Sequence, residues 1–256
     1  MQRKSLYQDI RKIREDMTQP EIIYEDEAIL VCHKPAGVAT QTKRLGQKDM
    51  ESILKNYIAA NNRKAGRTQP PYIGIVHRLD QPVEGVMVYA KTPQAAAKLS
   101  AQVKKRFMGK HYYALVQLPE GKQTMEEIRL GSKGTLDNEI AFDAKKNVST
   151  VMSQKTKETK HACLDYKVVA QRGQKLLLDI TLHTGRHHQI RVQLAHAGIP
   201  IVGDTKYGKY PEKQLGLCSY RITFEHPVSG TEMDYRIVPE NAEICAFLEE
   251  GKKYKS

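Results

Sequence analysis

The sequence predicts an α+β fold in which many short strands combine with a few helices. Short apolar runs recur along the 256-residue chain, as strands do, and only a few stretches have the spacing of an amphipathic helix. No internal repeat or clean linker divides the chain. We therefore expect one domain over residues 21–250, preceded by a short N-terminal arm (1–20) and followed by a basic tail (251–256).

The first strands and the first helix follow from the N-terminal part of the domain. Two β-prone runs, at residues 22–24 and 28–32, are separated by an acidic turn and predict a pair of strands. The His-Lys-Pro-Ala-Gly segment at residues 33–37 is expected to break the second strand. A polar stretch then contains a predicted helix over residues 50–61.

The middle of the chain has the densest pattern. Apolar runs at residues 73–76 and 85–90 predict two strands on either side of a polar segment. Thr92 supplies an N-cap, and a proline stands at the first helical position after it. Apolar residues then recur every four positions, which predicts an amphipathic helix over residues 93–107.

The C-terminal half alternates between strands and turns, with two helices. Residues 120–160 are polar and rich in turns, with hairpins expected around 131–134 and 143–147. The remaining predicted elements are strands at 110–116, 162–170, 176–182, 221–225 and 233–237, helices at 187–197 and 241–250, and a loop at 203–208.

Charge and hydropathy exclude several classes of protein. The 41 Lys and Arg residues exceed the 29 Asp and Glu residues, so the formal net charge is +12 and a polyanion is the natural partner. No apolar run approaches the roughly 18–20 residues that span a bilayer. The charged N-terminus lacks the apolar stretch of a secretory signal. We therefore expect a soluble, cytoplasmic protein that does not contact a membrane.

The four cysteines do not form a metal or redox motif. Cys32, Cys163, Cys218 and Cys245 lie far apart, and none forms a C-x-x-C pair, which argues against zinc ribbons and thioredoxin-type sites. We expect most of them to be buried apolar side chains rather than members of disulfides.

Two motifs carry candidate chemistry. The His-Arg-Leu-Asp sequence at residues 77–80 lies between two apolar runs, although by itself it is equally compatible with a surface ion pair. Residues 182–192 form a strand, a glycine turn and a helix, where Arg186 would strengthen anion binding by free N–H groups. His183 and His187 are four residues apart, but the turn spoils their helical register, so we expect no metal site.

In their order and spacing, these motifs resemble the RluA-like family of pseudouridine synthases over about residues 22–238. Six stretches carry the resemblance: a strand and Lys-Pro-x-Gly turn (29–37), His-Arg-Leu-Asp (77–80), Lys-x-Tyr-x-Ala-x-Val (110–116), Thr-Gly-Arg-x-His-Gln-Ile-Arg (184–191), Gly-x-Pro-Ile-x-Gly-Asp-x-x-Tyr-Gly (198–208) and Phe-x-His-Pro (224–227).

The resemblance implies a mixed, largely antiparallel sheet with flanking helices and a central RNA-binding cleft. It also implies an isomerase that acts on uridines in structured RNA, either ribosomal or transfer RNA. Such an enzyme breaks the N1–C1′ bond, turns the uracil over and rejoins it through C5. Because no redox step or water is required, neither a metal nor an organic cofactor is expected. The protein is also expected to be a monomer.

The resemblance also assigns roles to individual residues. Asp80 is the catalytic carboxylate, acting as a nucleophile at C1′ or as a base at C2′. Arg191 pairs with Asp80, holding it ionised and aimed, and Tyr112 stacks on the uracil and helps to remove the C5 proton. Arg78 fills the gap that the flipped base leaves. The other expected substrate-binding residues are Ile190, as an apolar wall behind the tyrosine, His77, Arg186 and Gln189.

The chain departs from the family pattern at two places near these residues. Val83 and Glu84 replace a common Thr-Ser pair, and His187 replaces the usual Thr or Ser. The Glu84 carboxylate could raise the pKa of Asp80 by repulsion, point to solvent, or change the choice of substrate. Two alternatives stay open: a catalytically silent RNA-binding relative, and a glycosidase that uses Asp80 and Glu84 as its carboxylate pair and releases free uracil.

The short arm cannot form a separate RNA-binding domain, so the catalytic domain is expected to hold the RNA itself. The basic residues expected to contribute are Arg63, Lys64, Arg67, Lys104, Lys105 and Lys206. Lys104 and Lys105 have a second explanation, since cations in a last helical turn also offset the helix dipole.

Overall fold

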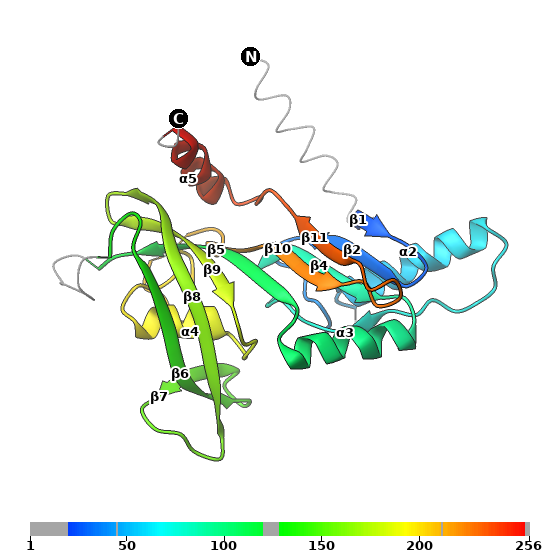
Figure 1. The fold of residues 1–256 in the computed structure, drawn as a ribbon, viewed down its shortest axis with the longest axis horizontal. Coiled ribbons are helices and arrows are strands. Elements are labelled where there is room, and N and C mark those ends of the chain that lie inside the picture. The colour runs from blue at the N-terminus through cyan, green and yellow to red at the C-terminus, as the bar shows by residue number, and fades with distance from the viewer. Residues whose placement is uncertain (1–19, 45, 120–127, 211, 254–256) are drawn as a thin grey trace.

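The computed structural model describes residues 20–44, 46–119, 128–210 and 212–253. Its strands are β1 (Glu21–Glu25), β2 (Ile29–Lys34), β3 (Gly74–Ile75), β4 (Glu84–Ala90), β5 (Gly109–Gln117), β6 (Lys133–Asp143), β7 (Val148–Met152), β8 (Thr159–Arg172), β9 (Lys175–Leu182), β10 (Leu217–Glu225) and β11 (Glu232–Arg236). They form one sheet in the order β1-β2-β4-β10-β5-β9-β8-β6-β7, with β11 paired to β10 and β3 paired to β4 (Figure 1). Among the described pairs, β4 and β10 run parallel and the others antiparallel, which confirms the predicted mixed, largely antiparallel sheet.

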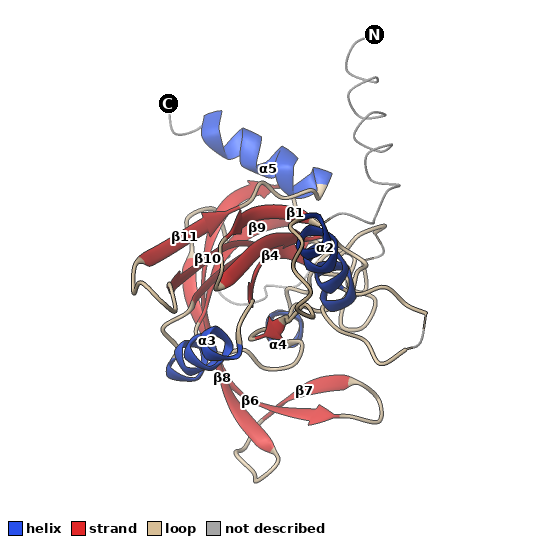
Figure 2. Ribbon diagram, turned by 90° about the vertical axis from the view of Figure 1, so that its right-hand side faces the viewer, coloured by secondary structure: helices blue, strands red, loops and turns tan. Residues whose placement is uncertain are grey.

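Four described helices flank this sheet (Figure 2): α2 (Met50–Lys64), α3 (Pro93–Lys105), α4 (Gln189–His196) and α5 (Ala242–Lys253). Side chains of α2 and α4 share one apolar cluster with Met87 and Tyr89 of β4. Val86 and Val88 point the other way and pack with α3, while α5 packs on the same side over Leu115 of β5. The helices therefore cover opposite faces of the sheet in pairs, α2 with α4 and α3 with α5.

β4 lies inside the sheet, and its sequence explains why. All seven of its residues are buried, which fits the unbroken apolar run of a strand that is covered on both faces. Gly85 makes the parallel pairing with β10 possible. A Cβ atom at this position would lie 2.4 Å from the Cβ atom of Ser219 on the neighbouring strand, so only glycine allows the two backbones to approach.

The helix ends are set by local capping. Asp49 accepts a hydrogen bond from the backbone of Ser52 and caps α2, which runs three residues beyond its predicted end. The Thr92 hydroxyl accepts from the Ala95 N–H at 3.1 Å, as its position predicts for α3. Arg106 adopts a left-handed conformation with φ +62°, so α3 ends at Lys105 rather than at residue 107.

Three other predicted boundaries were wrong. β2 continues through His33 and Lys34, where a break was expected, because both residues pair with β4. The helix predicted from residue 187 begins at Gln189, since His188 has φ +52° and cannot be its first helical residue. α5 extends to Lys253, three residues beyond the predicted end of this helix at residue 250. Residues 1–19 of the predicted arm and residues 254–256 lie outside the described part.

The polar segment after β5 contains more strand than its composition indicates. Nine of the eleven residues of β6 are exposed or half-buried, but Leu136 and Ile140 are buried, and Ile140 packs against Ala162 of β8 and Val192 of α4. The hairpin expected around residues 143–147 is confirmed, since β6 and β7 pair from Asp143↔Val148 onward. The feature expected around 131–134 is a turn that leads into β6 rather than a hairpin between strands.

The cysteines fit the sequence expectation in part. Cys32 and Cys218 are buried, Cys163 and Cys245 are half-buried, and all four are free thiols. None of the described helices is both long enough and apolar enough to cross a membrane.

Candidate active site

The loop that carries Asp80 lies between β3 and β4 and is fixed from two sides. The Thr40 hydroxyl donates to the Leu79 carbonyl at 3.0 Å and accepts from the Leu79 N–H at 3.2 Å. The Gln81 carbonyl accepts from the Gly37 N–H at 2.8 Å and from Lys34 Nζ at 3.2 Å. The residues on both sides of Asp80 are therefore anchored in the protein, and its side chain extends from a rigid loop.

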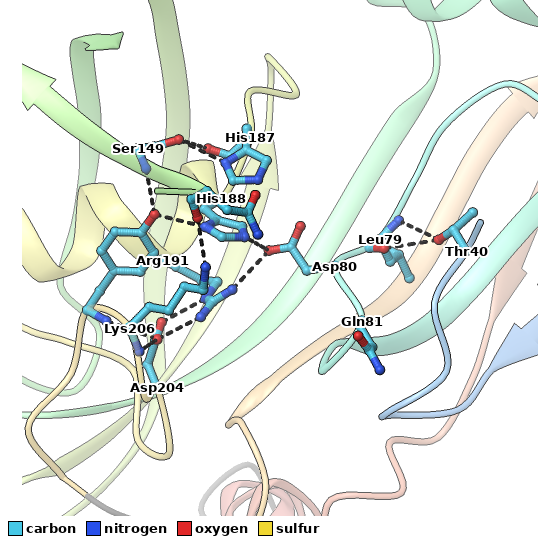
Figure 3. A network of polar contacts seen from close by, with 12 residues as sticks. Thr40, Leu79, Asp80, Gln81, Ser149, His187, His188, Arg191, Asp204 and Lys206 are labelled. Atoms are coloured by element: carbon cyan, nitrogen blue, oxygen red, sulfur yellow. Dashed lines mark hydrogen bonds and ion pairs between the residues drawn. The ribbon is translucent and has the colours of Figure 1, made fainter. Parts of the chain in front are cut away.

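Asp80 meets Arg191 and His188 through one of its two oxygens (Figure 3). Oδ2 lies 3.3 Å from Arg191 Nη1 and 3.6 Å from His188 Nε2. Within the described residues, Oδ1 has no hydrogen bond, and the side chain is 28% exposed. The structure thus brings Asp80 and Arg191 together across 111 residues of sequence and leaves one carboxylate oxygen available to a ligand.

Asp204 holds Arg191 in place. Arg191 Nε and Nη2 each donate to one Asp204 oxygen at 2.8 Å, and the two side chains are 4% and 1% exposed. Asp204 Oδ1 also accepts from the N–H groups of Lys206 and Tyr207. Burial alone would raise the pKa of Asp204, but the hydrogen bonds and charge of Arg191 lower it, so the carboxylate is ionised. Asp204 lies in the motif at residues 198–208, but no role was predicted for it from the sequence.

His188 is a second residue whose place in the site the sequence did not reveal. The Ser149 N–H donates to Tyr207 Oη at 2.8 Å, and the same hydroxyl is hydrogen-bonded to His188 Nδ1 at 2.8 Å. Burial lowers the pKa of His188 to about 4, which keeps the ring neutral at pH 7. Its Nε2 is the nitrogen that faces Asp80. The His-Gln-Ile-Arg motif was the signal that could have identified it.

Tyr112 lies on β5 beneath this group. It is 6% exposed, and its side chain and that of Ile190 of α4 belong to the same extended apolar cluster. Burial raises the pKa of the Tyr112 hydroxyl, against a weaker opposing effect of the Ser219 side chain. At neutral pH this residue is a phenol and not a phenolate.

Of the predicted substrate-binding residues, Arg78 is exposed, and three others form hydrogen bonds within the protein. His77 Nε2 accepts from the Val88 N–H at 3.1 Å, and burial followed by the charge of Lys110 lowers its pKa to about 3. Gln189 is buried, and its Oε1 accepts from the Thr184 hydroxyl and from the Arg186 N–H. Arg186 Nε donates to the His161 carbonyl at 2.8 Å. These contacts brace the loops on both sides of the site.

Glu84 does not point to solvent. It is fully buried, and its two oxygens accept from the N–H groups of Glu240 and Asn241, each at 3.0 Å. Burial raises its pKa, while these two hydrogen bonds oppose the rise. Its carboxylate therefore anchors the segment before α5, and neither of these bonds involves Asp80.

The amine of Lys34 is buried behind the Asp80 loop. Its amine donates to the carbonyls of Pro35, Val38 and Gln81 at 3.0, 2.6 and 3.2 Å. Burial lowers its pKa to about 7, and the negative charges of Asp80 and Glu84 oppose that fall. The amine thus ties the turn after β2 to the loop of the candidate carboxylate.

The candidate metal ligands lie elsewhere. His183 Nε2 contacts Asp165 at 2.7 Å and His187 contacts Ser149, so the two histidines have separate partners. Within the described residues, one group could hold a metal ion: Glu21, His33 and Glu240, with ligand atoms within 4.8 Å of one another. This group does not include Asp80.

The predicted RNA-binding cations lie in three places. Arg63, Lys64 and Arg67 are exposed at and beyond the end of α2. Lys104 and Lys105 are exposed in the last turn of α3, where they also suit the helix dipole. Lys206 is exposed beside Asp204, and its amine donates to the Asn147 carbonyl at 2.7 Å. Of these six, Lys206 is the cation that belongs to a loop of the candidate site.

The sequence of the chain is similar to those of known proteins. Residues 28–196 match the profile of RNA pseudouridylate synthases. The chain is 32% identical over 253 residues to ribosomal large subunit pseudouridine synthase D of Vibrio cholerae, which covers 91% of this chain and 72% of that protein. It is 31% identical over 219 residues to an RNA pseudouridine synthase of Mycoplasma genitalium, covering 84% of this chain and 65% of that protein.

The fold is also similar to that of a solved human structure. The human RNA pseudouridylate synthase domain containing 1 superposes with a TM-score of 0.68 at 19% identity, over 89% of this chain and 86% of that one. At this identity the likeness concerns the fold alone. The chain spans 65% to 72% of the length of the two bacterial relatives above.

Proposed function

The chain belongs to the RNA pseudouridylate synthase family, and on that basis we propose that it isomerises uridine to pseudouridine in structured RNA. The RluA-like family predicted from the motifs is confirmed by the match over residues 28–196 and by the relative from Vibrio cholerae. Because that relative is named for the ribosomal large subunit, large-subunit ribosomal RNA is the first substrate to test.

The contact between Asp80 and Arg191 is the observation that carries the proposal. A catalytic carboxylate must approach the ribose of an extruded uridine without losing its orientation. Arg191 binds Oδ2 while Asp204 fixes the far side of the guanidinium, so the free Oδ1 is available to attack C1′ or to take the proton at C2′. Asp80 is therefore already oriented by Arg191 for the chemistry that we assign to it.

Tyr112 and Ile190 supply the apolar support for the uracil ring in this proposal. Both belong to one buried cluster beneath the site, and an aromatic face with an apolar neighbour is suited to stack on a pyrimidine. Since burial keeps Tyr112 protonated, stacking is the role that its surroundings favour, and phenolate chemistry is not. Arg78 is exposed next to Asp80 and is free to occupy the space that the flipped base leaves.

The surroundings of Glu84 weaken both alternatives. A glycosidase needs two carboxylates that face one sugar, but the Glu84 carboxylate is buried and bonded to the backbone before α5. The silent-binder alternative was motivated by the same substitution, and this carboxylate lies outside the Asp80–Arg191–Asp204 group. Neither alternative therefore gains support from the residue that suggested it.

Incubation with transcribed ribosomal and transfer RNAs tests the proposal, with pseudouridine mapped by mass spectrometry. We expect product at defined uridines with the natural protein and none with Asp80→Asn, which preserves shape while removing the charge. Absence of product from every RNA would favour a silent binder. Product that survives Asp80→Asn would refute the assigned mechanism, and release of free uracil would indicate a glycosidase.

A further inference from the structure

An aromatic ladder leads from Asp80 to the protein surface. His188 lies 3.6 Å from the Asp80 carboxylate, and its ring centroid is 3.7 Å from that of His187. The His187 ring is 4.1 Å from the ring of Phe142 on β6. Phe142 is 48% exposed, so the outermost ring of the ladder presents a large apolar surface to solvent close to the candidate site.

The middle ring of the ladder is held in one orientation. The Ser149 hydroxyl donates to the His187 carbonyl at 2.7 Å and therefore accepts from Nδ1–H of the same residue at 3.1 Å. Burial lowers the pKa of His187, so the ring is neutral at pH 7 and its Nε2 is an acceptor. A fixed, neutral imidazole is a firm support for the Phe142 ring. His187 is also the residue that replaces the usual Thr or Ser of the family motif.

Exposed cations lie on the segments that carry and flank this ladder. Arg78 and Lys206 are exposed, and both are close enough to His187 to lower its pKa. The turn between β6 and β7 adds Lys145 and Lys146, which are exposed three and four residues after Phe142. Aromatic rings among cations are the combination with which proteins bind unpaired nucleic acid, since the rings stack on bases and the cations follow the backbone.

We propose that Phe142, supported by His187, is a stacking site for an unpaired base that neighbours the target uridine. The proposal rests on the proposed function, because the RNA is placed by Asp80. The ring centroids are 3.7 and 4.1 Å apart and the rings are tilted by 32° and 41°, so the rings are in contact, and the exposed part of Phe142 remains available to a base. This site lies on the β6–β7 hairpin and is separate from Tyr112 and Ile190.

Substitution of the ring tests the site. Phe142→Leu keeps an apolar side chain and removes the aromatic face, whereas Phe142→Tyr keeps the face. Each variant is mixed with the substrate RNA carrying 2-aminopurine at one position at a time beside the target uridine, and both fluorescence quenching and Kd are measured. Tyr72→Leu, the same kind of change at an exposed ring beside Gly74, serves as the matched control.

We expect quenching at one position with the natural protein and with Phe142→Tyr, and its loss with Phe142→Leu. Loss of one stacked base should weaken binding by at least about fivefold. An abasic residue at that same position should abolish the difference between Phe142→Leu and the natural protein. Quenching and Kd that are unchanged in Phe142→Leu at every position would overturn the proposal, as would an effect that survives every abasic substitution.

Pseudouridine mapped in the same samples separates this proposal from the proposed function. Product without Phe142-dependent quenching rejects the stacking site and leaves the isomerase intact. Phe142-dependent quenching without product supports the stacking site and rejects the isomerase.

Discussion

Asp204→Asn should damage both stability and catalysis, because Asp204 satisfies a buried guanidinium. The two hydrogen bonds of 2.8 Å join side chains that are 4% and 1% exposed. An asparagine must place its NH₂ group either against Arg191 Nε or against Arg191 Nη2 and the N–H groups of Lys206 and Tyr207, so at least one donor faces another. Removing one partner of a buried ion pair costs about 3–5 kcal/mol, and we expect a loss of that size in the free energy of unfolding.

The catalytic effect follows from the freedom that Arg191 gains. A misplacement of about 1 Å can cost about 100-fold in rate, so kcat for pseudouridine formation should fall by roughly that factor. Urea denaturation measures the first effect, and single-turnover product formation at temperatures where the variant is folded measures the second. A free energy of unfolding within about 1 kcal/mol of the natural value, together with normal kcat, would refute the reasoning.

Asp234→Asn is the matched control for this experiment. Asp234 also forms a two-pronged ion pair, with Arg221 at 2.8 and 2.9 Å, but these side chains are 37% and 28% exposed. Exposed pairs contribute about 0–1 kcal/mol, so this variant should keep nearly all of its stability and activity. The contrast between the two aspartates isolates burial as the cause.

Three further predictions concern groups around the site. Burial lowers the pKa of Lys34 to about 7, so between pH 7 and about 10 the unfolded chain binds more protons than the folded protein does. The free energy of unfolding should therefore rise by about 2 kcal/mol from pH 7 to 9, and Lys34→Met should remove that rise in urea denaturation. Glu84→Gln should lower the free energy of unfolding by about 1–3 kcal/mol, because the NH₂ group of the glutamine would face the N–H group of Glu240 or Asn241. An unchanged urea midpoint would contradict this expectation. Tyr207→Phe removes the hydroxyl that binds Ser149 and His188, and should lower kcat with little effect on KM; a changed KM with normal kcat in steady-state assays would argue against a positioning role.

Many features of the fold could be predicted from local sequence because they depend on nearest neighbours. Apolar runs such as that of β4 have the period and composition of buried strands, and Thr92 with the proline after it determines the start of α3. The motifs around Asp80 and Arg191 identified the family, because the order and spacing of these motifs can be read directly from the sequence. That Asp80 contacts Arg191 was implied by the resemblance and by nothing in the local pattern.

Features that depend on distant partners were decided only by the tertiary structure. β6 is polar and becomes a strand because Ile140 packs against α4, which lies some fifty residues later in the chain. The Glu84 carboxylate turns toward the backbone before α5 because β4 lies beside β10, and no local signal states this pairing. The roles of Asp204 and His188 arise in the same way. The sequence determines the type of each side chain. How deeply a side chain is buried, and which charged groups lie beside it, depends on which segments the sheet brings together.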